Sequence, residues 1–277
     1  MALLGIDLGG TKLALAVFTD DGEILSKESV TLENRKGNEV GKLITDNVTR
    51  LINSFEEQGN NINSIGISVP GISHISRGTV WAPNIKGWDD YPLLREVKAV
   101  SGEIPVIIDS DRACYILGES WKGNARGCKD AVFLSVGTGI GAGILINGEI
   151  LRGSHDIAGC IGWMALSRPF DNKYISCGYF EHYASGAGIA RAAMEFVKEQ
   201  KDYTGELRNK QVEKITSFDV FSAYDNGDPL AAGVIQFCVE LWGMAVANLV
   251  SLFNPERIIL GGGVFGPAVP LIQEIYE

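Results

Sequence analysis

The sequence has few of the features that mark nucleic-acid-binding, membrane or secreted proteins. Among its 277 residues, Lys and Arg total 24 against 34 Asp and Glu, and no basic run is present. Nucleic-acid binding and attraction to an anionic membrane surface therefore have little electrostatic support. The N-terminus carries neither the basic region nor the apolar core of a signal peptide, and no apolar stretch reaches the roughly 18 residues of a membrane span. We expect neither nucleic acid nor membrane as a partner.

Cysteine is also sparse. The five cysteines, Cys114, Cys128, Cys160, Cys177 and Cys238, are scattered, odd in number and form no C-x-x-C pair. This pattern predicts reduced thiols that mostly pack, and a cytoplasmic location. The chain also lacks the Walker A motif, the dinucleotide-binding fingerprint and the protein-kinase catalytic loop. A nucleotide would have to be held in another way.

Glycine, by contrast, is abundant: the chain has 34, where an average chain of this length has about 20. Three glycine turns each follow a predicted buried strand: Gly9-Gly10-Thr11, Gly137-Thr138-Gly139 and Gly261-Gly262-Gly263. Successive backbone N–H groups in such turns hold anions, and the two threonines add hydroxyl donors. Lys12 either supplies countercharge or faces solvent. The turns predict a phosphate site formed by two β-hairpin turns, with tight turns that bind nothing as the alternative.

The opening of the chain recurs in its second half. Leu3–Phe18 is typical of a strand, a glycine turn and a strand, and an Asp-Gly turn then leads to Glu-Ile-Leu. Ala131–Ile146 has the same order, followed by an Asn-Gly turn and Glu-Ile-Leu. A supersecondary unit that is repeated more than 100 residues apart predicts two similar half-molecules, with chance recurrence of a common hairpin as the alternative. We place the boundary so that residues 1–110 form an N-terminal subdomain and residues 111–277 a C-terminal one.

Apolar periodicity predicts the remaining elements. Helices are expected at Glu39–Gln58, Leu93–Ser101, Ala113–Lys122, Ala184–Glu199 and Pro229–Phe253. Short buried strands are expected at Ile65–Val69, Pro105–Ile108 and Arg257–Leu260. A last helix is expected from Ala268.

Three carboxylates stand at strand ends. Asp7 precedes the first glycine turn on an otherwise apolar strand, which suits indirect Mg²⁺ binding beside a phosphate, with an Asx turn as the alternative. Asp109 and Asp111 follow the strand that ends at Ile108, and alternation puts both on one face. One of them can deprotonate an alcohol. Asp111 also stands immediately before a predicted helix, where it would serve as N-cap, and the two roles do not exclude each other.

Several motifs together resemble the ROK family, which comprises repressors, uncharacterised reading frames and sugar kinases. They are Asp7–Lys12, Pro70-Gly71, Ala82-Pro83-Asn84 with Trp88, Leu117-Gly118-Glu119, Val136–Gly141, Ala184-Ser185-Gly186 and Asn254-Pro255 through Gly263. They follow the family's order and spacing over nearly the whole chain. The resemblance is to the sugar kinase branch, which includes glucokinase, fructokinase and N-acetylmannosamine kinase. It implies an α/β fold of the actin-like ATPase type, which is a duplicated RNase H-like fold of two domains with ATP in the cleft between them.

The resemblance also implies roles for single residues. Asp111 matches the catalytic aspartate, the general base that accepts the proton of a sugar hydroxyl as its oxygen attacks the γ-phosphate of ATP. ATP with Mg²⁺ would be held by Asp7, Gly9, Gly10, Thr11, Lys12, Gly137, Thr138 and Gly139, with Gly261, Gly262 and Gly263 bordering the adenosine. The sugar would contact Gly71, Asn84, Ser110, Asp111, Cys160, Trp163 and Glu181, the last of which matches a glutamate that binds a sugar hydroxyl. The family is commonly dimeric, so we expect a homodimer.

The chain departs from the family where sugar is recognised. Ser110 stands where the family usually has Asn, and the motif A-G-E-I-G-H reads Ala158–Trp163 here, so its Glu and His are replaced by Cys160 and Trp163. The zinc segment C-x-C-G-x-x-G-C reads Asn172–Tyr179, with one cysteine out of register. Since zinc needs about four N or S ligands, we expect no structural zinc. Trp163 either stacks on a pyranose face or fills the space that zinc would occupy.

The leading hypothesis is an ATP- and Mg²⁺-dependent kinase for a hexose or amino sugar. A catalytically silent sugar-binding or regulatory protein of the same family, without a DNA-binding domain, is the alternative. A transcriptional regulator is disfavoured because the first glycine turn begins within ten residues of Met1, which leaves no room for an N-terminal helix-turn-helix. Family members usually continue with another strand and helix after the third glycine turn, so we expect a truncated or shortened C-terminal end.

Overall fold

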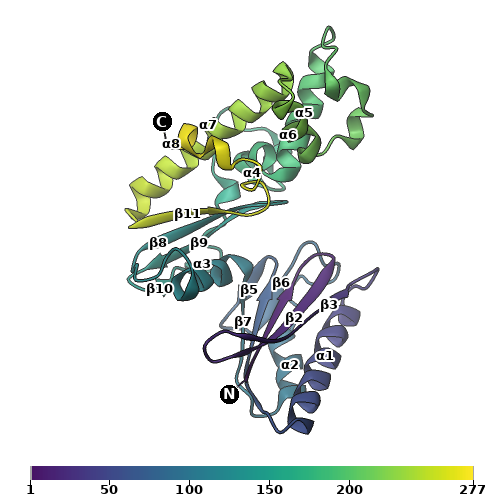
Figure 1. Cartoon of the computed structure of the whole chain (residues 1–277), viewed down its shortest axis with the longest axis vertical. Helices are drawn as coiled ribbons and strands as arrows, with labels where there is room; N and C mark the ends of the chain where they lie inside the picture. Colours follow the sequence, from purple (N-terminus) through teal and green to yellow (C-terminus); the bar gives the residue numbers. More distant parts are fainter. Residues whose placement is uncertain (1, 277) are drawn as a thin grey trace. The chain divides into compact units, whose positions relative to one another are not determined.

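The computed structural model describes residues 2–276 as two compact units (Figure 1). The first unit contains the chain up to Cys114 together with Arg152–Ile157. The second contains Tyr115–Leu151 and the chain from Ala158 onward. The short return segment Arg152–Ile157 thus belongs to the first unit although the second unit flanks it in sequence.

The first unit is a sheet with helices packed on it. Its strands are β1 (Ala2–Leu8), β2 (Lys12–Thr19), β3 (Ile24–Thr31), β4 (Ile62–Val69), β5 (Ile72–His74), β6 (Thr79–Trp81) and β7 (Val106–Ser110), and its helices are α1 (Asn38–Glu57) and α2 (Leu93–Ser101). The main sheet has the order β3-β2-β1-β4-β7, in which β1, β4 and β7 run parallel and β2 is antiparallel to both of its neighbours. The buried face of α1 carries apolar residues at helical spacing, among them Val40, Ile44 and Val48, as the sequence predicted.

The second unit repeats four of the five strands of this sheet. Its strands are β8 (Ala131–Val136), β9 (Ile140–Ile146), β10 (Glu149–Ile150) and β11 (Arg257–Gly261), and its helices are α4 (Gly178–Ala184), α5 (Gly186–Glu199), α6 (Ser217–Asp225), α7 (Pro229–Phe253) and α8 (Ile272–Tyr276). The sheet order is β10-β9-β8-β11, with β8 antiparallel to β9 and parallel to β11. The strands β1, β2, β3 and β4 therefore correspond to β8, β9, β10 and β11, which confirms the predicted duplication.

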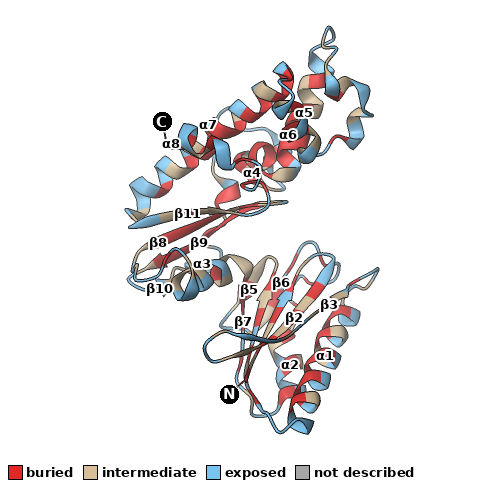
Figure 2. Ribbon diagram, viewed as in Figure 1, coloured by how far each residue is buried: buried red, intermediate tan, exposed pale blue. Residues whose placement is uncertain are grey.

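Helix α3 (Asp111–Lys122) begins in the first unit and ends in the second. Its Ile116 packs with Phe133 and Ile259 of the second sheet. Helices α4, α5, α6 and α7 contribute to the largest buried cluster together with strands β8 and β9, and Figure 2 shows buried residues in each of these helices. The fold is α/β throughout.

Helix α7 is long and apolar enough to cross a membrane, with a mean hydropathy of 1.7 in its most apolar window. The expectation that no stretch has this character is wrong. Half of that window is buried, and Trp242 donates a hydrogen bond from Nε1 to the carbonyl oxygen of Ala184 at 3.0 Å. Asp228 caps the helix by accepting bonds from the N–H groups of Leu230 and Ala231. These contacts are those of a helix that packs in a protein core.

The predicted helix Ala184–Glu199 is wrong at its start, because the chain breaks at Ser185 between α4 and α5. Ser185 adopts an extended conformation, and its Oγ accepts a bond from the N–H of Gly188 at 3.0 Å. The next N–H, that of Gly186, donates to the carbonyl oxygen of Gly137 at 2.7 Å. The break therefore turns the start of α5 toward the second glycine turn.

The third glycine turn follows β11 and packs against β8. Gly262 has φ +95°, and a Cβ at this position would overlap the backbone of Val136. We expect Gly262→Ala to lower stability by about 2 kcal/mol, because the left-handed backbone and the overlap both oppose a side chain. Thermal or urea unfolding measures this change.

Gly263→Ala is the matched control. Nothing lies within 4 Å of a Cβ at Gly263, so this variant should unfold close to the wild type. Equal stability of the two variants would contradict the described packing of the turn.

Candidate active site

The carboxyl ends of three parallel strands meet at one edge of the first sheet. Asp7 lies on β1, Gly71 follows β4, and Ser110 ends β7 just before Asp111 begins α3. Gly71 has φ +107°, and a Cβ there would overlap the carbonyl oxygen of Trp81. Ligands of open α/β sheets bind outside the carboxyl ends of such strands. The structure thus brings these four predicted site residues to the same edge.

Asp109 and Asp111 have different surroundings. The Asp109 carboxylate is 8% exposed and receives two bonds from the Arg152 guanidinium, at 2.8 and 2.6 Å. It also accepts a bond from the N–H of Ser110 at 2.8 Å. Asp109 therefore has a structural role, since it ties the return segment to the end of β7.

The N-cap of α3 is Ser110 and not Asp111, for which the sequence predicted this role. The Oγ of Ser110 accepts a bond from the N–H of Ala113 at 3.4 Å, three residues into the helix. Asp111 accepts only the N–H of Arg112, at 2.7 Å, and no salt bridge to it is found within residues 2–276. Of the two predicted carboxylates, Asp111 is the one that stays available for chemistry.

Burial raises the pKa of the Asp111 carboxyl above its ordinary value. The neighbouring Arg112 opposes this shift by charge and by its backbone N–H, whereas the charge of Asp7 adds to the rise. Asp7 therefore lies close enough to Asp111 for the two carboxylates to interact. A partly buried carboxyl with a raised pKa is typical of a general base that works near neutral pH.

The first glycine turn leaves backbone donors free. Gly9 donates its N–H to the carbonyl oxygen of Lys12 at 2.9 Å, and Thr11 accepts a bond from Leu32 at 2.8 Å. Across the described part of the chain, the N–H groups of Gly10 and Thr11 have no partner. The side chain of Asn84 lies against Gly10, where a Cβ would approach its amide nitrogen to 3.2 Å.

The second glycine turn has the same property. Gly137 donates to the carbonyl oxygen of Gly139 at 2.9 Å, whereas the N–H groups of Thr138 and Gly139 lack a partner among residues 2–276. Two consecutive free N–H groups form an anion-binding concavity. Each predicted hairpin turn therefore presents a pair of backbone donors.

A cavity of about 550 Å³ opens beside the second turn. Gly137, Thr138 and Gly263 line one side of it. The other residues come from α5, from α6 and the loop before it, and from the segment after β11: Gly186, Ala187, Ala190, Ile215, Thr216, Ser217, Phe218, Phe221, Val264 and Pro267. Apart from Gly186, which lies in the motif Ala184-Ser185-Gly186, the residues from α5 and α6 carry no motif and were not predicted from the sequence. Gly261 lies over the ring of Phe133 instead and is not part of the lining.

The predicted sugar residues of the second unit surround a short 3-10 turn, Ile161–Trp163. Cys160 precedes this turn, and Trp163 is 55% exposed at its end. Glu181, on α4, lies against Gly162. Burial raises the pKa of the Glu181 carboxyl, and the N–H of Ile140 and the charge of Arg191 oppose that rise.

Aromatic residues occupy the segment that the resemblance assigns to zinc. Tyr174, Tyr179, His182 and Tyr183 pack edge to face, with ring centroids between 4.7 and 6.0 Å apart. The Lys173 ammonium lies over the rings of Tyr174 and Tyr183. Within residues 2–276, no group of three or more His, Cys, Asp or Glu side chains is placed to hold a metal ion. The absence of zinc stays a prediction.

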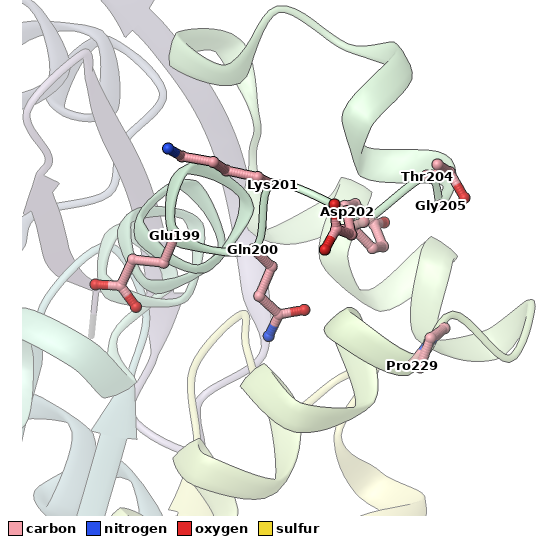
Figure 3. Close-up of a pocket in the computed structure, with 8 residues that line it drawn as sticks. Glu199, Gln200, Lys201, Asp202, Thr204, Gly205 and Pro229 are labelled. Atoms are coloured by element: carbon pink, nitrogen blue, oxygen red, sulfur yellow. The ribbon is translucent and has the colours of Figure 1, made fainter.

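A second hollow, of about 760 Å³, lies between the end of α5 and the start of α7. Figure 3 shows that Glu199, Gln200 and Lys201 point in different directions there. Asp228, behind the hollow, is fully engaged with Tyr203 and three backbone N–H groups. The charged residues that line it are exposed, and none of its lining residues belongs to a glycine turn or to a predicted site, so this hollow is not a candidate active site.

The raised pKa of Asp111 predicts a pH-dependent stability change. A carboxyl that is harder to ionise when folded destabilises the fold at neutral pH, so Asp111→Asn should raise the Tm there. The gain should shrink as the pH falls through the folded-state pKa and vanish below the ordinary value of 3.8. Thermal unfolding at a series of pH values measures this.

The matched variant Asp109→Asn should lower the Tm at neutral pH. It weakens the bidentate bond to Arg152, whose side chain is 35% exposed, so a loss of about 1–2 kcal/mol is expected. Tm shifts of the same sign for both variants would contradict the different roles of the two carboxylates.

Comparison with known proteins agrees with this geometry. The chain is 35% identical to a glucokinase of Halalkalibacterium halodurans over 282 residues, covering 99% of this chain and 84% of that protein. It is 31% identical to a xylose repressor of Caldicellulosiruptor bescii, covering 94% of this chain and 65% of the repressor. A solved ROK family glucokinase from Streptomyces griseus, in complex with glucose and AMPPNP, superposes with a TM-score of 0.76 at 28% identity, covering 99% of this chain and 89% of that one.

The ROK family model matches residues 3–274. The expected actin-like ATPase fold is confirmed by these structural relatives. The duplicated sheets, the paired glycine turns and the family match lead to one conclusion: this chain belongs to the ROK family.

Proposed function

We propose that this chain, which its relatives place among the sugar kinases, transfers the γ-phosphate of ATP to a hydroxyl of a hexose or amino sugar. The observation that carries the proposal is the unpaired, partly buried Asp111 at the strand edge that also presents Asp7 and the free N–H groups of Gly10 and Thr11. Phosphoryl transfer depends mainly on positioning and on neutralising charge.

The nucleotide end of the site belongs to the second unit. The cavity beside Gly137 and Thr138 has the volume and the mostly apolar lining that suit an adenosine. The free N–H groups of Thr138 and Gly139 stand next to it as phosphate donors. ATP is therefore the donor substrate that fits, and the Streptomyces griseus relative was solved with its analogue AMPPNP.

Asp111 is the proposed general base. Its carboxylate accepts the proton of the sugar hydroxyl while the hydroxyl oxygen attacks the γ-phosphorus, and ADP leaves with the electrons of the broken P–O bond. The raised pKa improves the match between this carboxylate and an alcohol proton.

The residues present also suit Mg²⁺. Asp7 is an exposed carboxylate beside the first glycine turn, and Mg²⁺ keeps waters and substrate phosphates while taking only one or two protein carboxylates. When bound with ATP, the ion neutralises phosphate charge. Mg²⁺ dependence, a homodimer and a cytoplasmic location belong to this proposal.

Each unit is proposed to contribute sugar contacts of its own: Asn84 and Ser110 in the first unit, Trp163 and Glu181 in the second. Trp163 is 55% exposed, so its ring is free to stack on a pyranose face. The buried tyrosines 174 and 183 occupy the neighbouring segment, which weakens the idea that Trp163 fills a space left by zinc.

A sugar-binding regulator without catalysis is the second candidate. The xylose repressor is 31% identical to this chain, and the replacement of the family's Glu and His by Cys160 and Trp163 alters the sugar site. The raised pKa of Asp111 and its lack of a salt-bridge partner match what a general base needs, which favours catalysis.

Asp111→Asn should abolish the proton transfer. We expect kcat to fall about 100-fold or more while the affinity for ADP is unchanged, as measured by ADP release over a panel of sugars and by calorimetry. Asp46→Asn, which alters an exposed carboxylate paired with Lys42 on α1, is the control and should keep full activity. Undiminished turnover of Asp111→Asn would reject the assigned base.

Trp163→Ala should raise KM for the sugar by about threefold to tenfold, because it removes a stacking surface. KM for ATP should not change. Trp121→Ala, which removes another half-exposed tryptophan, is the control. A sugar KM equal to that of the wild type would show that Trp163 does not contact the substrate.

A further inference from the structure

The second glycine turn is held at both of its ends by the junction of α4 and α5. At one end, the N–H of Gly186 donates to the carbonyl oxygen of Gly137 at 2.7 Å. At the other, the N–H of Ile140 donates to Oε2 of Glu181 at 2.6 Å. The two donors that lie between these ends, at Thr138 and Gly139, are left free. The junction therefore fixes the turn without using the groups that face a phosphate.

The carboxylate of Glu181 is enclosed by glycines. A Cβ at Gly139 would lie 2.7 Å from Oε2, and a Cβ at Gly162 would lie 2.9 Å from the Cβ of Glu181. Any larger residue at either position would push the carboxylate away from Ile140. The close approach of α4 to the turn thus depends on small residues on both sides of Glu181.

The two oxygens of this carboxylate are not equivalent. Oε2 receives the N–H of Ile140, whereas Oε1 has no hydrogen-bond partner within residues 2–276. A hydrogen bond to a charged acceptor is stronger than one between neutral groups, so a charged Oε2 is a firm anchor for the turn. Oε1 remains able to accept a bond from a ligand hydroxyl.

We propose that Glu181 is a positioning residue for the phosphate turn, in addition to its place in the sugar site. Oε2 holds Ile140 and thereby keeps the N–H groups of Thr138 and Gly139 aimed at the β- and γ-phosphates. Oε1 serves the sugar. The inference rests on the proposed kinase function, and it makes one side chain responsible for both substrates. Without Glu181 the turn would have to be ordered by the nucleotide, which lowers the affinity for phosphates even when no sugar is present.

Calorimetry without sugar tests this, with ADP and adenosine as probes. Glu181→Ala should weaken ADP binding about tenfold, as expected for the loss of one charge-assisted hydrogen bond. Adenosine binding should be nearly unchanged, because adenosine carries no phosphate for the N–H groups of Thr138 and Gly139 and because Glu181 itself does not line the cavity. Glu195→Gln, which alters a nearby carboxylate on α5 that contacts neither glycine turn, is the matched control and should bind ADP like the wild type.

Glu181→Gln separates the role of Oε2 in holding the turn from the role of Oε1 in binding sugar. It also keeps the test valid if the alanine variant does not fold. Its amide oxygen can still accept the N–H of Ile140, so ADP affinity should stay near that of the wild type. Its amide NH₂ replaces the free acceptor, so KM for the sugar should rise about tenfold. ADP affinity of Glu181→Ala equal to that of the wild type would overturn the inference alone. A wild-type protein that binds no ADP would overturn the kinase proposal and this inference together.

Discussion

The availability of Asp111 depends on the two residues that precede it. Arg152 pairs with the charge of Asp109, and the Ser110 hydroxyl caps α3. Asp111 is therefore needed neither for an ion pair nor for the helix cap. Three consecutive polar side chains at the end of β7 thus have three different roles: an ion pair, a helix cap and a free carboxylate. A change at Asp109 would leave the half-buried Arg152 without its partner, and a change at Ser110 would leave α3 without its cap.

The ion pair between Asp109 and Arg152 also holds the return segment in the first unit. Arg152 starts the return segment Arg152–Ile157, which lies in the first unit although β10 before it and the 3-10 turn after it belong to the second. Asp156 of the same segment lies 3.8 Å from His74. The proposed base and the segment that leads to Cys160 and Trp163 are therefore anchored to the same strand end.

Both halves of the duplicated fold contain a glycine turn with free N–H groups, but different contacts hold the turn in each half. In the first unit, Leu32 donates to Thr11 and Asn84 covers Gly10. In the second, Gly186 and Glu181 hold the turn at its two ends. Each half of the protein therefore fixes its hairpin turn with contacts from residues that the repeat does not share.

Much of the fold and of the candidate site could be predicted from short sequence patterns. The glycine turns, the repeat and the bounds of α2 and α7 follow from turn chemistry and apolar periodicity. The break at Ser185 was not predictable, because Ala184-Ser185-Gly186 continues a helical pattern and the reason for the break lies 48 residues away at Gly137. The pairing of Asp109 with Arg152 and the lining of the cavity by Phe218 likewise depend on tertiary contacts that no spacing encodes.

The most direct test of the account is a crystal structure with AMPPNP, Mg²⁺ and the sugar that gives the highest turnover. In that complex, a carboxylate oxygen of Asp111 should lie about 2.6–3.2 Å from the acceptor hydroxyl, and the γ-phosphate should contact the N–H groups of Thr138 and Gly139. A γ-phosphate bound away from both glycine turns, or an acceptor hydroxyl out of reach of Asp111, would contradict it.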